Sequence, residues 1–258
     1  MPPISVAAIQ SLRIRTGVPI SACKEALEEA GGDEEKAIEL LRKRGIAQAA
    51  KKASRAQAEG LIFQKTNDNT CAMFALRCET DFVARDEHFL QAGEQILDLL
   101  FSKGVEAATT LASEALPVLV QKLGENITAD EMHRIEAPIL GSYLHSNRKI
   151  GVIIGLDGAT QEIARDIAMH AAALSPRYVH PEEVGADVVE KEREIWREQL
   201  KTEGKPEAIW EKILLGKEKK FREENAITKQ AFVKDPSKTV EQHLSDAKIT
   251  TYVRISIG

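Results

Sequence analysis

One pattern of strands followed by a helix occurs twice in this chain and constrains the fold strongly. Apolar, strand-like runs at 61–63 and 70–76 flank a turn at 67–69, as two paired strands do. Helical spacing follows, with apolar side chains on one side at Phe89, Ile96, Leu97 and Leu100. From Gly141 the same order returns, which predicts two related units, each with a small sheet and a helix.

The second copy has its strand-like runs at 142–145 and 150–154, with a turn at 146–148 between them. The helix that follows places apolar side chains on one side at Ile163, Ile167 and Ala171. Residues 84–86, Ala-Arg-Asp, correspond to the same three residue types at 164–166. We therefore predict an α+β fold whose core contains two related αβ subdomains with antiparallel sheets.

The N-terminal region has the pattern of three short helices. Ser5, Ser21 and Asp33 are placed to cap them, and Gly31 and Gly45 are placed to end the second and third. The positions predicted to face inward are Ile9, Leu12, Cys23, Ala26, Leu27, Ala30, Ala37, Leu40 and Leu41. A three-helix bundle of this size resembles a ubiquitin-associated-type domain. The alanine-rich residues after it predict a polar, partly helical linker at 46–59.

Charged residues dominate between 181 and about 225, where two amphipathic helices are predicted around 188–196 and 208–214. The turn at 204–206, Gly-Lys-Pro, is short enough for the helices to fold back as an antiparallel coiled-coil hairpin. Because strand-like runs follow the hairpin, it is predicted to be an insertion in the second subdomain. These runs lie at 231–233 and 251–255.

The predicted parts of the chain have definite boundaries. They are an N-terminal ubiquitin-associated-like domain with its linker at 1–54, a core N-subdomain at 55–139, a core C-subdomain at 140–180 and 227–258, and the coiled-coil hairpin at 181–226.

The charge balance argues against a nucleic-acid partner. With 35 basic and 40 acidic residues the net charge is −5, and aromatic residues are only 5% of the chain, too few for base stacking. The three cysteines form no CxxC pair, which is typical of a reducing cytoplasm. The N-terminus lacks the pattern of a secretory signal, and the most apolar run, 150–156, is too short to cross a bilayer. We therefore predict a cytoplasmic protein with no membrane or nucleic-acid partner.

The sequence lacks the common motifs of nucleotide-binding and hydrolytic enzymes. It has no GxxxxGK phosphate loop, no GxSxG nucleophile motif, and six histidines that never fall at metal-ligand spacing. Gly151, Gly155 and Gly158 lack the spacing of a dinucleotide-binding loop. We expect no catalysis of covalent chemistry and no bound metal, nucleotide or other cofactor.

Several separated segments, in a definite order along the chain, carry a resemblance to a known family. They are Leu-Arg-Ile-Arg-Thr-Gly at 12–17 with Cys-Lys-Glu-Ala-Leu at 23–27, Arg-Cys-Glu-Thr-Asp-Phe-Val-Ala at 77–84, Leu-Gly-Ser-Tyr-Leu-His at 140–145, Ile-Ala-Met-His at 167–170 and Asp-Pro-Ser-Lys-Thr-Val at 235–240. Together they resemble the motifs of the bacterial elongation factor Ts family, and the resemblance runs nearly from end to end. Departures from the family pattern stand at Pro19, Ile20, Ser21, Ala75 and Arg77. Because the last predicted strand ends next to Gly258, we expect the contact made by the family's C-terminal helix to be missing.

This resemblance implies a guanine nucleotide exchange factor that binds elongation factor Tu, with GDP or without nucleotide, and promotes GDP release. Two sets of site residues follow from it. The set that displaces Mg²⁺ from the partner GTPase matches Thr80, Asp81, Phe82 and Val83. The set that contacts the partner elsewhere matches Arg13, Ile20 and His145.

Residue types alone leave other interpretations open. Phe82 also suits the core, with Asp81 as a helix N-cap, while Arg13 and His145 suit ordinary exposed positions. An alternative function is a ubiquitin-associated-like interaction module that binds another partner, although it leaves the Thr-Asp-Phe-Val segment unexplained. A third is an RNA-binding translation accessory protein, which the net charge of −5 opposes.

Two further features allow more than one interpretation. The basic residues at 42–44 and 51–52 suit contact with RNA, but a solvated helix end is the simpler interpretation. The charged hairpin is a candidate for a homodimer, because coiled-coil pairing is a common route to dimers. Trp196 and Trp210 are expected to pack inside the hairpin.

Overall fold

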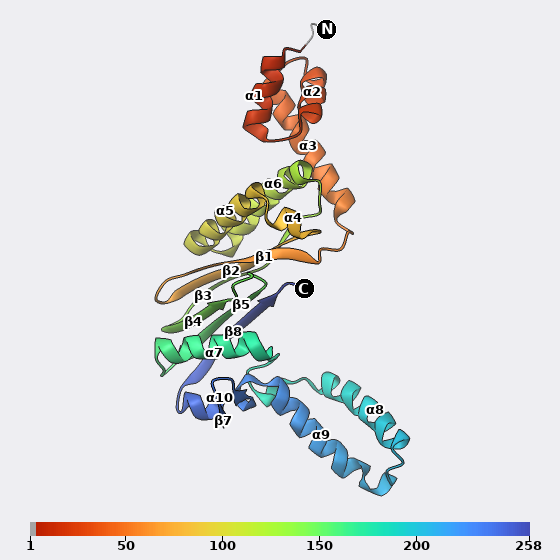
Figure 1. Cartoon of the computed structure of the whole chain (residues 1–258), viewed down its shortest axis with the longest axis vertical. Helices are drawn as coiled ribbons and strands as arrows, with labels where there is room; N and C mark the ends of the chain where they lie inside the picture. Colours follow the sequence, from red (N-terminus) through yellow and green to blue (C-terminus); the bar gives the residue numbers. More distant parts are fainter. Residues whose placement is uncertain (1–3) are drawn as a thin grey trace. The chain divides into compact units, whose positions relative to one another are not determined.

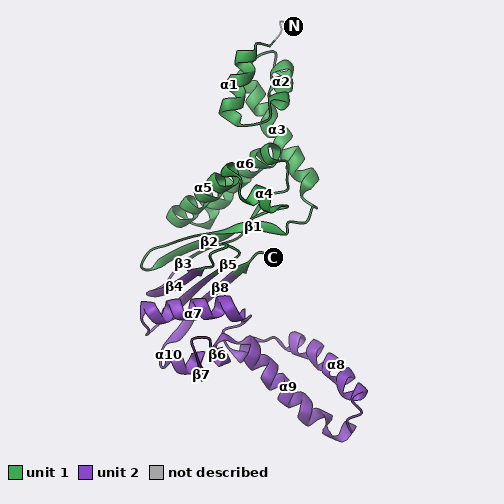
Figure 2. Cartoon of the chain, in the orientation of Figure 1, with its two compact units in different colours: residues 1–135, 144–151, 255–258 green, residues 136–143, 152–254 purple. Residues whose placement is uncertain are grey.

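Along the chain, three helices come first, then a first sheet with its helices and then a second sheet, whose last strand follows a helical hairpin (Figure 1). A computed structural model describes residues 4–258, and its mixture of helices and small antiparallel sheets is the predicted α+β fold. Two compact units divide the chain, one with residues up to 135, 144–151 and 255–258, the other with 136–143 and 152–254 (Figure 2). The domain boundaries given above stay predictions.

The first three helices pack around one apolar cluster. They are α1 (Val6–Thr16), α2 (Ile20–Glu29) and α3 (Glu34–Lys52). The predicted caps Ser5 and Asp33 are confirmed, since their side-chain oxygens accept the N–H groups of Ala8 and Lys36, each at 3.1 Å. The buried cluster consists of Leu12, Val18, Cys23, Ala26, Leu27, Ala37 and Leu41.

Two predicted helix boundaries in this region are wrong. Ser21 does not cap α2, because the helix already begins at Ile20, directly after Pro19. Gly45 does not end α3, which continues to Lys52, so half of the predicted linker is helix. Gly45 is instead a point of close approach, where a Cβ would lie 2.8 Å from the carbonyl oxygen of Pro117 in α6 (Val105–Leu123). A pattern within α3 cannot show this contact, because α6 supplies half of it.

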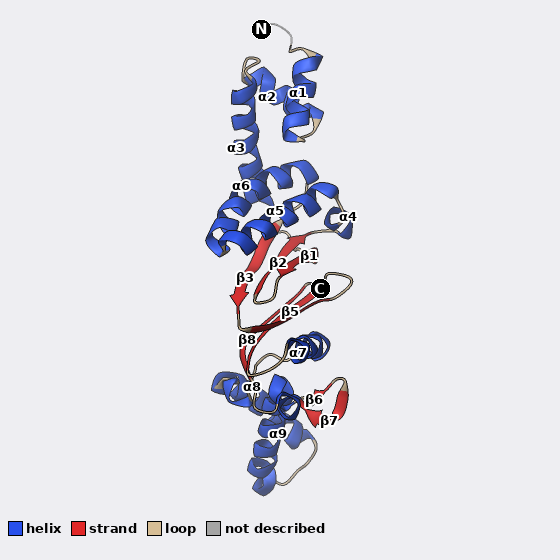
Figure 3. Ribbon diagram, turned by 90° about the vertical axis from the view of Figure 1, so that its left-hand side faces the viewer, coloured by secondary structure: helices blue, strands red, loops and turns tan. Residues whose placement is uncertain are grey.

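The first sheet has the order β1-β2-β3 and carries helices on one face (Figure 3). Its strands are β1 (Glu59–Thr66), β2 (Thr70–Cys78) and β3 (Thr128–Glu136), and its helices are α4 (Asp81–Ala84), α5 (Glu87–Lys103) and α6. β1 and β2 are antiparallel, with Glu59 opposite Cys78 and Thr66 opposite Cys71. The predicted inward residues of α5 are confirmed as buried, and Phe63 of β1 stacks on Phe74 of β2 beneath this helix. Neither α6 nor β3 was predicted.

The second sheet has the order β4-β5-β8, with α7 packed nearby. The strands are β4 (Ile139–Leu144), β5 (Ile150–Asp157) and β8 (Lys248–Ser256), and the helix is α7 (Gln161–Leu174). The predicted turn between β4 and β5 and the apolar side of α7 agree with this arrangement, since Ile163 is half-buried and Ile167 and Ala171 are fully buried. A small ladder and a short helix come before β8. They are β6 (Ala231–Phe232), β7 (Asp235–Thr239) and α10 (Val240–Leu244). The first strand of the ladder falls on the predicted run at 231–233, whereas its second strand and the helix were not predicted.

The charged segment folds as two antiparallel helices, α8 (Ala186–Thr202) and α9 (Trp210–Asn225). Trp196, Leu200 and Leu214 form its buried centre, with Trp210 packed against them, so both tryptophans lie inside the hairpin as expected. Short 3-10 turns stand at its base and tip, at Pro181–Glu183, Glu207–Ile209 and Ile227–Lys229.

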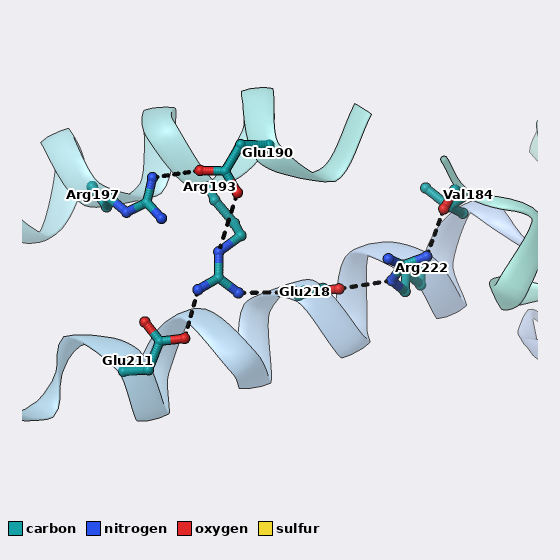
Figure 4. A network of polar contacts seen from close by, with 7 residues as sticks. All are labelled: Val184, Glu190, Arg193, Arg197, Glu211, Glu218 and Arg222. Atoms are coloured by element: carbon teal, nitrogen blue, oxygen red, sulfur yellow. Dashed lines mark hydrogen bonds and ion pairs between the residues drawn. The ribbon is translucent and has the colours of Figure 1, made fainter. Parts of the chain in front are cut away.

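A network of charged groups joins α8 to α9 (Figure 4). The guanidinium of Arg193 lies 2.6 Å from Glu211 and 3.0 Å from Glu218 of the opposite helix, and 3.8 Å from Glu190 of its own. Glu218 in turn pairs with Arg222 at 3.0 Å, and Arg222 donates to the carbonyl of Val184 at 2.6 Å. These bonds hold the register of the two helices and tie α9 to the base of the hairpin.

Two possible kinds of site are not found in the part of the chain that the structure describes. Within residues 4–258, no helix is both long and apolar enough to cross a membrane. No group of three or more histidine, cysteine, aspartate or glutamate side chains in that range is arranged to hold a metal ion.

Candidate functional site: an exposed acid and ring after the second strand

The chain turns sharply where β2 ends. Four residues, Thr80, Asp81, Phe82 and Val83, form this bend and are called here the 80–83 turn. Thr80 is the N-cap of α4, and its hydroxyl accepts the N–H of Val83 at 3.4 Å. Asp86 then caps α5 by accepting the N–H of His88 at 2.8 Å. The chain thus begins two helices within a few residues, and the short segment between the two caps contains exposed side chains as well as buried ones.

Phe82 and Asp81 are the residues that this bend presents. The Phe82 side chain is 81% exposed, which is unusual for a large aromatic group and rules out a place in the core. Asp81 lies in the first turn of α4 and pairs with exposed Arg85 at 3.0 Å. The interpretation of Asp81 as an N-cap is wrong, because Thr80 occupies that position.

Thr80 and Val83 face the other way and hold the turn on the core. The Thr80 hydroxyl donates to Glu125 at 2.6 Å, and Val83 packs against the buried cluster that includes Phe89. The four residues therefore divide into two that anchor and two that are free to meet a partner.

Arg13 and Ile20 line a hollow of about 480 Å³ that also reaches the end of this bend. Both are exposed, Ile20 by half. The complete lining consists of Arg13, Gly17, Val18, Pro19, Ile20, Asp86, His88, Lys122 and Leu123. The structure thus brings two of the predicted partner contacts close to the helix start that follows Phe82 in the chain.

Glycine is favoured at position 17, which lines this hollow. Its φ of +67° lies in the left-handed region that side chains rarely adopt, and the flexible end of Lys122 lies beside it. Burial lowers the pKa of Lys122 below the ordinary value for lysine, although Asp86 and Glu87 act in the opposite direction. For Asp86, burial raises the pKa, but the hydrogen bonds from His88 outweigh it and the pKa is lowered.

His145 lies elsewhere, in the turn between β4 and β5, and is not among the residues of the hollow. Its Nδ1 is 3.0 Å from the amide oxygen of Asn147, and its backbone N–H donates to the carbonyl of Ile150 at 2.9 Å. The side chain is half-buried. His145 is therefore a well-held turn residue that does not line the hollow of Arg13 and Ile20.

Two residues of this site were missed at the level of sequence. Lys122 lies in the last turn of α6, a helix that was itself not predicted, and Glu125 follows the end of this helix. Glu125 meets Thr80 across a sequence separation of 45 residues, and no local pattern of residues signals such a pairing.

Comparison with known proteins bears directly on this turn. The family model described as elongation factor TS matches residues 79–258, a match that begins at the turn itself. Proteins called elongation factor Ts from Idiomarina loihiensis and Aeromonas hydrophila are 44% and 43% identical over 267 residues, which cover 99% of this chain and 91% of each relative. The elongation factor Ts of Marinobacter nauticus is 42% identical over 266 residues, with 100% of this chain and 92% of the relative covered. With identity at this level over almost the whole length, the chain belongs to the elongation factor Ts family of translation elongation factors.

Proposed function

We propose that the chain is a guanine nucleotide exchange factor that binds elongation factor Tu in its GDP-bound and nucleotide-free states and promotes GDP release. Family membership supports this proposal, and the observation that carries it is the exposed Phe82 beside Asp81 on a turn that is anchored from behind. No covalent chemistry is needed for this activity, so the protein is not an enzyme in that sense.

Thermodynamic linkage defines what the turn must do. A factor that binds the GTPase more tightly without nucleotide weakens nucleotide binding by the same factor. A nanomolar nucleotide is held by about 12 kcal/mol, and each tenfold loosening costs about 1.4 kcal/mol. The Mg²⁺ and phosphate groups are the most effective target, because charge interactions are concentrated there.

The residues of the 80–83 turn have separate roles in this proposal. Phe82 inserts between side chains of the nucleotide domain of the partner, which removes its exposed ring from water. Asp81 disturbs the groups around the metal, and it can do so because its ion pair with Arg85 is exposed. Thr80 and Val83 keep both groups in place.

The N-terminal helices supply a second contact. Arg13 and the half-exposed Ile20 line the hollow beside Asp86, so a partner seated there lies next to the residues that follow the turn. His145 provides a third contact from the turn between β4 and β5. A nucleic-acid partner is not part of the proposal, since the net charge is −5, and neither is a membrane. We also propose that the protein acts in the cytoplasm.

The hairpin is proposed to pair with a second copy of the chain. Ile195 of α8 and Leu215 of α9 are 52% and 58% exposed, so apolar surface remains outside the packed centre of the hairpin. Sedimentation of wild type and of an Ile195→Glu, Leu215→Glu double variant tests this pairing. A monomeric wild type at tens of micromolar would remove the homodimer from the proposal.

The exchange activity is tested by following release of a fluorescent GDP analogue from purified elongation factor Tu with Mg²⁺. Wild type should accelerate the release, and Phe82→Ala should weaken binding by about 2–4 kcal/mol, as loss of a hot-spot aromatic does. Ile46→Ala is the matched control, since Ile46 is an exposed apolar residue of α3, 52% exposed, outside the turn and the hollow. A Phe82→Ala variant that releases GDP as fast as wild type at every concentration contradicts the proposal.

The alternative, a ubiquitin-associated-like module with another partner, gives a different result in the same assay. It requires an intact surface on α1–α3 but predicts no acceleration of GDP release by wild type. This alternative also does not explain why Phe82 is exposed.

A further inference from the structure

Glu125 reaches the back of the 80–83 turn from the loop that follows α6. One carboxylate oxygen accepts the backbone N–H groups of Glu79 and Thr80, at 2.9 and 3.0 Å. The other oxygen accepts the Thr80 hydroxyl at 2.6 Å. A single side chain thus makes three charge-assisted hydrogen bonds to the two residues that lead into the turn.

The bonding is reciprocal between the two segments. The Glu79 carboxylate accepts the backbone N–H of Asn126 at 2.7 Å, and this bond is the main reason that the pKa of Glu79 is lowered. The buried Asn126 side chain donates to the carbonyl of Arg55 at 3.0 Å. Hydrogen bonds therefore run in both directions between residues 79–80 and residues 125–126. This set of bonds, called here the clasp, constrains the two segments more strongly than one bond between two loops would.

The Glu125 carboxylate also orients the hydroxyl of Thr80, the N-cap of α4. A threonine hydroxyl has one proton to donate, and in this site the proton goes to Glu125. The lone pairs of the same oxygen then remain for the N–H of Val83, which begins α4. Glu125 is in this way connected through Thr80 to the backbone that carries Asp81 and Phe82.

This support is needed because α4 cannot hold itself. A helix of four residues is far below the length at which helices are stable alone. Phe82 is too exposed to add packing, so the position of its ring depends on the clasp and on Val83 and Ala84.

We propose that Glu125 is a positioning residue for nucleotide exchange, one that holds the 80–83 turn in the geometry in which Phe82 and Asp81 enter the partner. This inference rests on the proposed function. It assigns to Glu125 no contact with the partner, and its effect passes through Thr80.

Glu125→Gln is the test variant, because the amide keeps the size of the side chain but replaces one acceptor oxygen with a donor that faces N–H groups. We expect the maximal rate of GDP release at saturating protein to fall about tenfold, as the loss of one or two charge-assisted bonds allows. The concentration for half-maximal release should rise less than it does in Phe82→Ala, because the Phe82 ring is retained and the hollow around Arg13 and Ile20 is untouched. Glu114→Gln is the control, since Glu114 of α6 is exposed and its ion pair with exposed Arg42 is long, at 3.9 Å, and therefore weak.

Combined variants separate positioning from general stability. In a background that carries both Asp81→Ala and Phe82→Ala, Glu125→Gln should have no further effect on the maximal rate if it acts through the turn, whereas a loss of folding would still lower it. Thr80→Val should lower the maximal rate of GDP release as Glu125→Gln does, and Thr80→Ser should retain the wild-type rate. The double variant Thr80→Val, Glu125→Gln should be no slower than either single variant. Independent, multiplying losses in these pairs overturn the inference.

Amide hydrogen exchange tests the clasp without the partner. In Glu125→Gln, exchange at Glu79, Thr80 and Val83 should accelerate at least about tenfold, while amides of β1 and α5 keep their protection. If wild type failed to release GDP and these amides still loosened, the proposed function would fall and the positioning role of Glu125 would stand. Unchanged protection together with an unchanged release rate refutes the role of Glu125.

Discussion

The carbonyl oxygen of Pro117 lies 2.8 Å from the place where a Cβ on Gly45 would stand. Helix α3 crosses α6 at this point, and the absence of a side chain allows the two backbones to come this close. The obstacle is main chain rather than the end of a flexible side chain, so it cannot move aside at low cost.

Gly45→Ala should therefore destabilise the protein by about 1–3 kcal/mol, as overpacking does, despite the better helix propensity of alanine. Urea denaturation followed by circular dichroism measures the change. Gly216→Ala is the matched control, because Gly216 lies within α9 with nothing near its missing Cβ, and it should stabilise by about 0.5–1 kcal/mol. Equal effects of the two changes would show that α3 and α6 are not packed as described.

The two phenylalanines on either side of Asp86 should respond oppositely to truncation. Phe89 is fully buried in the cluster under α5, so Phe89→Ala should cost about 3–5 kcal/mol of stability. Phe82 is exposed, so Phe82→Ala should change stability by less than about 0.5 kcal/mol while impairing nucleotide exchange. Thermal unfolding of the two variants compares them, and a strongly destabilised Phe82→Ala would place its ring in the core instead.

His170 predicts a dependence of stability on pH. Its ring is buried, with Nδ1 accepting the N–H of Val233 at 3.2 Å and Nε2 2.9 Å from the amide oxygen of Gln230, which requires the neutral ring with its proton on Nε2. Burial lowers the pKa of His170 below 6.5, while the bond to Gln230 acts in the opposite direction.

The unfolded chain therefore takes up this proton first as the pH falls. The stability that His170 contributes is complete above about pH 6.5 and decreases below it, with a slope of at most about 1.4 kcal/mol per pH unit. Free energies of unfolding between pH 8 and pH 5 test this for wild type and His170→Gln. Burial also lowers the pKa of His133, so the difference between the two proteins is the informative quantity. Parallel curves would show that His170 does not carry the effect.

Arg193 should matter more to the hairpin than its neighbour Arg197. The Arg193 side chain is 13% exposed and meets carboxylates of both helices, whereas Arg197 is 38% exposed and bonds to Glu190 of its own helix. Arg193→Met should destabilise the hairpin by about 1–2 kcal/mol, and Arg197→Met by less than about 1 kcal/mol. Hydrogen exchange in α8 and α9 reports this locally, and the difference should persist in 0.5 M salt. A reversed order would mean that the network in Figure 4 does not hold the helices together.

Local patterns were sufficient for much of this fold. Apolar alternation and turn residues predicted the hairpin of β1 and β2, helical spacing predicted α5 and α7, and Ser5 and Asp33 capped helices as their positions suggested. These features depend on residues close together in the chain, so their cause is visible in the order of residues. The Thr-Asp-Phe-Val segment likewise pointed to its family before any geometry was known.

Features that join distant residues became clear only in three dimensions. β3 is an edge strand with mostly half-buried, polar residues, so it lacks the alternation that marks a strand. Gly45 looks like a helix end until α6 is seen against it. The exposure of Phe82 and its anchoring through Glu125 depend on a contact across 45 residues, because hydrogen bonds of this kind form between surfaces that folding brings together.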